Sequence, residues 1–173
     1  MNTTIPPSLP LADAERSLFA FALNVAERLQ QEHEDIPACM LAVLPDGDVA
    51  VISLSEMTKP EVNQLARNAS AETPVALIMS AWRSRISHKP DSALAAAVRN
   101  GDPVVVMEPR LDPNRDEVAM VNLLHRDTRV IACAVVQKSA SHANRTLAAW
   151  EFQNLVPGNF RAMNFGDGNE RVL

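Results

Sequence analysis

The chain has 173 residues, of which 47% are hydrophobic and 21% charged, as is typical of one soluble globular domain with a sizeable core. The net charge of −5 is divided unevenly, because residues 1–72 carry eleven acidic and four basic side chains and residues 73–173 carry ten and twelve. The acidic first half argues against nucleic-acid binding. With no apolar run near the roughly 18 residues that span a bilayer and no secretory-signal pattern in residues 1–16, we expect a cytoplasmic protein without a membrane partner.

The first predicted element is a helix. Residues 1–12 contain three prolines and little periodicity, so we expect a flexible N-terminal arm. From Ala12 to about Glu34 apolar residues recur at spacings of three and four, which predicts an amphipathic helix with Asp13 as its N-cap. The apolar face of this helix is expected to contain Leu18, Phe21, Ala22, Val25 and Leu29.

A hairpin, a second helix and a strand are predicted next. Asp46-Gly47 lies between two β-rich runs in residues 39–55 and is a strong hairpin signal, because glycine adopts positive φ without steric cost. The sequence Thr58-Lys59-Pro60-Glu61 is typical of a capping box and predicts a helix that ends near Ala71. Read as a strand, residues 75–82 are predominantly apolar on both faces, which predicts a central strand.

The second half of the chain predicts mainly strands. A short helix is expected over residues 93–100 and a short strand over residues 104–109. The runs 117–124 and 129–138 flank a turn and predict a second hairpin. A short helix is expected over residues 147–152.

Because hairpins require antiparallel neighbours, we predict an α+β fold with one domain over residues 13–162 and a loose tail over residues 163–173. Its mainly antiparallel sheet, with two hairpins, is expected to be packed on one face by the N-terminal helix and the shorter helices.

Several catalytic and metal-binding motifs are absent from the sequence. The chain has five glycines and no glycine-rich phosphate loop or G-x-S-x-G sequence, and its four histidines lack metal-ligand spacing. Cys39 and Cys133 lie in strand-like contexts and are expected to be inert, buried thiols. A nucleophilic pair of Cys133 with His125 would need a thiolate beside an imidazole, and the mid-strand position of Cys133 argues against it. The sequence therefore indicates no cofactor, no metal and no catalytic set.

Two stretches have residues suited to a small anionic ligand. Trp82 ends the central strand and is followed by Arg83 and Arg85, and a guanidinium group that stacks on an indole keeps its donors available for a carboxylate or phosphate. Residues 108–117 form a proline-rich loop that includes Arg110 and Arg115 among four acidic side chains.

Both stretches also have a purely structural interpretation. Trp82 can close the edge of the core while the residues after it form a solvated loop. In the loop at residues 108–117, exposed ion pairs, each worth less than ~1 kcal/mol, can hold the backbone in place.

Short motifs in the sequence resemble those of a group of small uncharacterised α+β proteins of bacteria and their phages. In that group a strand ends in S-E-A-W, and the motif D-P-x-R-x-E precedes an apolar strand. Here Ser80-Ala81-Trp82 matches the first motif without its glutamate, and Asp112-Pro113-Asn114-Arg115-Asp116-Glu117 matches the second. The resemblance extends over roughly residues 36–162. It implies the α+β outline and carries no established activity.

Three hypotheses for the function follow. The first is a non-catalytic interaction protein, such as a phage or mobile-element accessory factor that binds a host protein or associates with itself. The second is a site that binds or hydrolyses a nucleotide or another small anion through Trp82, Arg83, Arg85, Arg110 and Arg115, with Glu117 as a general base. The third, nucleic-acid binding, is disfavoured because neither long helix is basic and aromatic residues are scarce. The sequence favours the first hypothesis.

Overall fold

The computed structural model describes residues 4–32, 36–83, 116–138 and 145–154. The chain forms two compact units, residues 1–81 with 118–173 and residues 82–117. In chain order the elements of the described residues are α1 (Asp13–Glu32), β1 (Cys39–Val43), β2 (Val49–Ser53), α2 (Lys59–Glu72), β3 (Val75–Arg83), β4 (Asp116–His125), β5 (Thr128–Lys138), β6 (Arg145–Leu147) and β7 (Glu151–Asn154).

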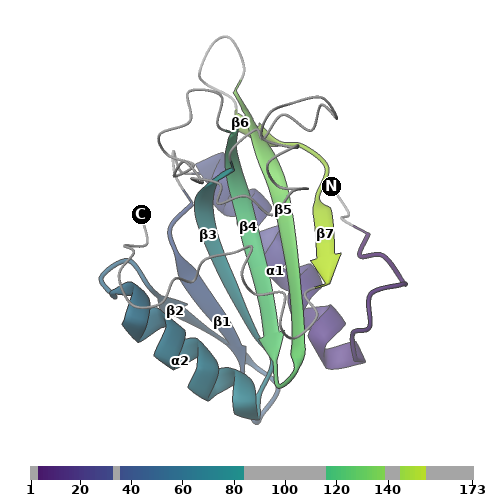
Figure 1. Ribbon diagram of the computed structural model, residues 1–173, viewed down its shortest axis with the longest axis vertical. Helices are drawn as coiled ribbons and strands as arrows, with labels where there is room; N and C mark the ends of the chain where they lie inside the picture. Colours follow the sequence, from purple (N-terminus) through teal and green to yellow (C-terminus); the bar gives the residue numbers. More distant parts are fainter. Residues whose placement is uncertain (1–3, 33–35, 84–115, 139–144, 155–173) are drawn as a thin grey trace, which may run out of the picture. The chain divides into compact units, whose positions relative to one another are not determined.

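The strands form one sheet in the order β2-β1-β3-β4-β5-β6, and β7 also pairs with β5 (Figure 1). The β1–β2, β1–β3, β4–β5, β5–β6 and β5–β7 pairs are antiparallel. The predicted α+β class, the mainly antiparallel sheet and both hairpins are confirmed. β3 lies in the middle of the order, as its apolar character on both faces predicts.

Both hairpin turns contain a residue with positive φ. Gly47 has a φ of 91° in the β1–β2 turn, in agreement with the Asp46-Gly47 signal. In the β4–β5 turn it is Arg126, with a φ of 49°. The Arg126 N–H donates a hydrogen bond to the Ser70 carbonyl at 2.8 Å, so α2 is tied to the second hairpin.

The two helices cover opposite faces of the sheet, which corrects the prediction that the helices share one face. Because side chains alternate along a strand, β3 places Ala76 and Ile78 in the core under α1 and places Leu77 and Met79 in the core under α2. Figure 1 shows α2 in front of the sheet and α1 behind it. A strand that is apolar on both faces needs cover on both, and a helix on each side provides that cover.

The α1 face is the larger core. Phe19 is fully buried there and meets Phe152 of β7 edge to face, with ring centroids 6.0 Å apart. Phe21, which was predicted to be on the buried face, is instead 47% exposed. The prediction grouped Phe21 with Leu18 and Ala22, but the buried stripe of α1 is centred about one residue later around the helix and contains Phe19, Leu23 and Ala26.

The start of α1 also differs from the prediction. Asp13 is the first helical residue and not the N-cap. The Glu15 carboxylate takes over the capping role, because its Oε2 accepts the Ala12 N–H at 2.9 Å. Before the helix, Ile5 is buried in the core under α1. The Arg16 guanidinium donates to the carbonyls that precede the helix, at 3.2 Å and 2.9 Å, so residues 4–12 lie against the body of the protein.

The predicted capping box of α2 is confirmed. The N–H and the hydroxyl of Thr58 both donate to Oε2 of Glu61 at 2.7 Å, and Pro60 lies in the first turn. The helix predicted over residues 147–152 is wrong, because these residues lie in β6, in β7 and between them. Apolar Leu147 and Phe152 pack on the core under α1 from strands paired with β5. The helix predicted at 93–100 and the strand at 104–109 lie outside the described residues.

Candidate functional site

The structure places part of the predicted Trp/Arg site. Trp82 lies near the end of β3 with 39% of its surface exposed, and Arg83 is the last residue of that strand. Arg85, Arg110 and Arg115 lie outside the described residues. The convergence of these side chains on the Trp82 ring therefore stays a prediction.

Glu117, the predicted general base of that site, is a buried residue of β4. Its neighbour Asp116 begins the strand and is half-buried. A buried carboxylate has the restricted position that a general base needs, but it also serves as a structural group when it is paired. Glu117 makes a polar interaction, as a paired structural carboxylate does.

The structure separates Cys133 from His125. Cys133 lies opposite Met120 in the β4–β5 pair, whereas His125 lies opposite Thr128, which puts the two side chains roughly 16 Å apart along the strands. They also project from opposite faces, since Cys133 packs in the core under α2 and His125 contacts Glu15 of α1. Burial raises the pKa of the Cys39 thiol, which keeps it in its unreactive protonated form.

Neither a metal centre nor a membrane span is found in the described residues. In residues 4–32, 36–83, 116–138 and 145–154 no cluster of three His, Cys, Asp or Glu side chains has the geometry to hold a metal ion. Within the same ranges neither helix is apolar enough over a sufficient length to cross a bilayer.

The strand β2 has an open edge. It is at the end of the strand order, so within the described part of the chain no strand pairs with its outer side (Figure 1). Two hydrogen bonds, one at each end of the β1–β2 pair, show which residues of β2 bond to β1. Leu44 donates its N–H to the Asp48 carbonyl at 2.8 Å, and Leu54 donates to Ala38 at 2.9 Å. Since hydrogen-bonded pairs alternate in an antiparallel ladder, the even-numbered residues of β2 bond to β1.

The odd-numbered residues of β2 therefore direct their backbone groups away from the sheet. The N–H and C=O groups of Val49, Val51 and Ser53 lie along the open edge. Their side chains are exposed as well, because Val51 has 65% of its surface accessible and Val49 has 36%. The open edge of β2 thus combines unpaired backbone groups with exposed β-branched side chains.

Natural sheets usually protect such an edge with a charge, a proline or a bulge. The five residues of β2, Val-Ala-Val-Ile-Ser, contain no charge and no proline. On the other side of the sheet, β6 carries Arg145 and β7 carries Glu151. The two edges of the sheet are therefore chemically different, and β2 is the one suited to pairing with another strand.

Sequence reasoning found the β1–β2 hairpin but not this site. The sequence shows that valine occupies positions 49 and 51 and that residues 49–53 carry no charge. What the sequence does not indicate is that β3 pairs with β1 on the side away from β2, since this depends on the order of the whole sheet.

Comparison with known proteins found no matching family model, no similar curated protein and no similar solved structure.

Proposed function

We propose that this protein is a non-catalytic interaction protein that associates with a second copy of itself by pairing the open edges of two β2 strands. The observation that supports this proposal most strongly is the exposure of Val51, at 65%, in the centre of an uncharged edge strand. Such an edge is a template for adding a strand from another chain.

Only the odd-numbered residues of β2 direct their backbone groups outward, and this restricts the registers in which two β2 strands can pair. The outward groups of one β2 must meet the outward groups of the other, and an antiparallel arrangement about a two-fold axis does so over the full strand when it is centred on Val51. In this register Val51 lies opposite Val51 of the second copy, and Val49 lies opposite Ser53. All outward N–H and C=O groups of the five-residue strand then find partners.

The distribution of charge is compatible with two copies of the same strand. The acidic residues nearest to β2 in the sequence are Asp48 before it and Glu56 after it. In the register centred on Val51, Asp48 lies opposite Leu54 of the second copy. No like charges therefore face each other within the paired strands. A homodimer with a closed two-fold axis is the commonest form of self-association, and it requires this kind of self-complementary surface.

The exposure of Val51 gives an estimate of the free energy gained when two β2 strands pair. Burying a valine side chain completely contributes roughly 1.5–3 kcal/mol, and 65% of the Val51 surface is still exposed. Pairing therefore gains about 1–2 kcal/mol per copy from this residue. A single paired strand is a small interface, so we expect a dissociation constant on the order of micromolar or weaker.

Sedimentation velocity over a range of concentrations tests the proposal. The wild type should shift from monomer to dimer as the concentration rises. Val51→Lys should weaken the dimer by at least about 30-fold, because it removes roughly 2 kcal/mol or more from the two copies together and places two positive charges at the axis. Phe21→Lys is the matched control, since Phe21 is also exposed but lies on α1, and it should dimerise as the wild type does.

Two results would contradict the proposal. A wild type that is monomeric at all concentrations up to the millimolar range would show that β2 does not pair with a second copy. A dimer that Phe21→Lys weakens as much as Val51→Lys does would show that association does not depend on the β2 edge.

A further inference from the structure

The helix α1 has one covered flank and one open flank. On the covered flank, the Arg16 guanidinium donates to two carbonyls of residues 4–12, and Glu27 accepts the Trp150 indole N–H at 3.0 Å. Trp150 lies between β6 and β7, which both pair with β5. Since an α-helix turns by about 100° per residue, Phe21 lies roughly 120° or more around α1 from Arg16 and Glu27. The flank with Phe21 is therefore directed toward the other end of the strand order, where β1 and β2 lie.

The strand β2 is covered on one face only. Val51 lies opposite Leu41 in the β1–β2 pair, and Leu41 belongs to the core under α1. The side chains of Val49 and Val51 therefore point to the α1 side of the sheet, yet they are 36% and 65% exposed. Their neighbour Ile52 points the other way and packs against the core under α2. Helix α2 thus covers one face of β2, whereas the opposite face is open on the side of α1.

The open flank of α1 and the open face of β2 form one apolar surface, the α1–β2 surface. Val49 and Val51 belong to its sheet part. Its helix part contains Phe21, which is 47% exposed, and Val25, which packs against the core one turn later. Neighbouring helices pack at about 8–10 Å, and neighbouring strands are about 4.8 Å apart. A second helix placed beside α1 would therefore lie over β2 and cover both parts.

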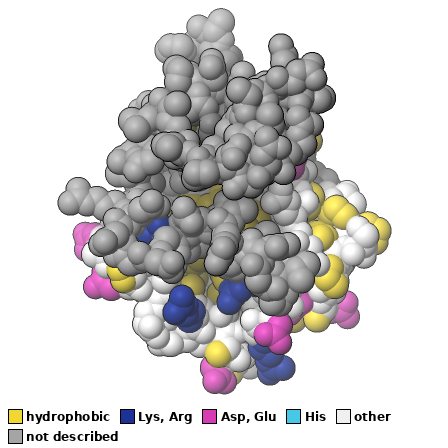
Figure 2. All heavy atoms as spheres, viewed as in Figure 1, with side chains coloured by type: hydrophobic (Ala, Val, Ile, Leu, Met, Phe, Trp, Pro, Cys, Tyr) yellow, Lys and Arg dark blue, Asp and Glu magenta, His cyan; other side chains and the backbone are white. Residues whose placement is uncertain are grey.

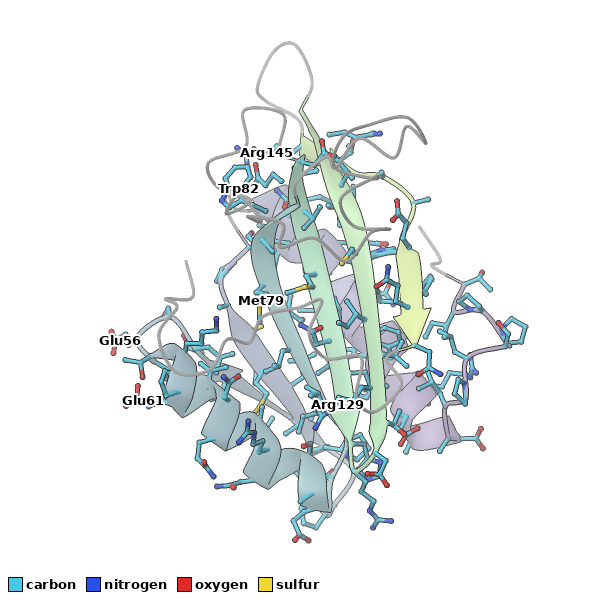
Figure 3. The ribbon with its side chains drawn as sticks, viewed as in Figure 1. Glu56, Glu61, Met79, Trp82, Arg129 and Arg145 are labelled. Atoms are coloured by element: carbon cyan, nitrogen blue, oxygen red, sulfur yellow. The ribbon has the colours of Figure 1, made fainter. Side chains whose placement is uncertain are left out.

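The charges next to this surface are acidic. Residues 36–57, which include β1 and β2, contain Asp46, Asp48 and Glu56 but no lysine, arginine or histidine. Figure 3 shows Glu56 and Glu61 at the β2 end of the sheet, and Figure 2 shows acidic side chains at this end in the same view. An occupant with basic side chains is attracted by such a rim, and an acidic occupant is repelled.

We propose that the α1–β2 surface binds an amphipathic helix of another protein, one with lysine or arginine on both sides of its apolar stripe. A helix fits because α1, which covers the adjoining part of the same sheet face, is itself an amphipathic helix. Pairing of two β2 strands uses their backbone groups, whereas helix docking uses their side chains on one face. The two interactions are therefore separable, and helix docking does not require the dimer.

Fluorescence anisotropy with designed peptides tests the proposal. The probe is a labelled peptide of about 18 residues, or five helical turns, made of leucine at helical spacing and lysine elsewhere. It should bind the full chain saturably, with a dissociation constant on the order of micromolar. One control peptide has glutamate in place of lysine, and the other has a central proline that breaks the helix. Both control peptides should bind at least about tenfold more weakly.

Two variants of the protein locate the binding. Phe21→Ala should weaken binding of the leucine–lysine peptide about tenfold, as expected for the loss of an aromatic anchor. Leu44→Ala is the matched control, because Leu44 is 41% exposed and follows Val43 in the alternation, so that it projects on the α2 side. Leu44→Ala should bind the peptide as the wild type does.

Sedimentation velocity separates this proposal from β2 pairing. Phe21→Ala should sediment as the wild type does at every concentration, although it binds the peptide more weakly. Three results would overturn helix docking at this surface. They are no saturable binding of the leucine–lysine peptide, equal binding of the glutamate peptide, and a loss of binding in Leu44→Ala as large as that in Phe21→Ala.

Discussion

The contact between Glu15 and His125 gives a quantitative test of how α1 is fixed to the sheet. Oε1 of Glu15 lies 2.7 Å from Nδ1 of His125, while Oε2 accepts the Ala12 N–H. The two side chains are 7% and 19% exposed. The contact joins the first turn of α1 to the end of β4, two elements 110 residues apart in the sequence.

Replacing His125 with leucine leaves one oxygen of a buried carboxylate without its partner. Hydrogen bonds to charged groups contribute about 1.5–3 kcal/mol, and a buried group left unpaired costs a similar amount. We therefore expect His125→Leu to lower the free energy of unfolding by about 2–3 kcal/mol, which for a chain of this length corresponds to roughly 4–12 °C in Tm. Glu15→Gln should cost less, about 1 kcal/mol, because the amide oxygen can still accept the Ala12 N–H.

The assay is urea unfolding of the wild type, both single variants and the double variant at neutral pH. A double-mutant cycle isolates the pairwise term, and we expect a coupling energy of about 1–2 kcal/mol. The denaturant slope should not change, since the surface exposed on unfolding stays the same. A coupling energy below about 0.5 kcal/mol would refute the reasoning, because the two side chains would then behave as independent sites.

Three further predictions concern single residues. The hydrogen bonds from Thr58 lower the pKa of Glu61, so its contribution to stability is present above the ordinary glutamate range and is lost as the pH falls through the lowered pKa. The difference in Tm between the wild type and Glu61→Gln should therefore shrink on acidification, and a pH-independent difference would contradict this. Phe19→Ala should cost about 3–5 kcal/mol in urea unfolding, whereas Phe21→Ala, at an exposed position, should cost less than about 1 kcal/mol; equal losses would show that the burial of α1 is misassigned. Because burial raises the pKa of Cys39, its thiol should react with an aromatic disulfide reagent at pH 8 far more slowly in the folded than in the urea-unfolded chain, and equal rates would contradict the burial.

The features that the sequence predicts correctly depend on neighbouring residues. The Asp46-Gly47 turn and the Thr58–Glu61 capping box each form within a few residues, so their chemistry is complete in the local sequence. The alternation in residues 75–82 likewise predicts a strand that is buried on both faces, and β3 is that strand.

Other features depend on contacts between distant segments. Hairpin turns specify which strands are neighbours, but not on which side of the sheet a connecting helix packs. The prediction that the helices share one face is therefore wrong, because β3 is covered by α1 on one face and by α2 on the other. The apolar residues around Leu147 and Phe152 suit a short helix or short strands equally well, and pairing with β5 decides between them.

The most direct measurement of the central claim is disulfide cross-linking through β2. In the register centred on Val51, this residue faces its own copy across the two-fold axis, with Cα atoms about 5.5 Å apart, a distance that a disulfide can bridge. Under mild oxidation Val51→Cys should give a covalent dimer, whereas Val49→Cys, which would face Ser53 of the second copy, and the wild type should remain largely uncross-linked. If Val51→Cys yields no more covalent dimer than Val49→Cys, the two β2 strands do not pair as proposed.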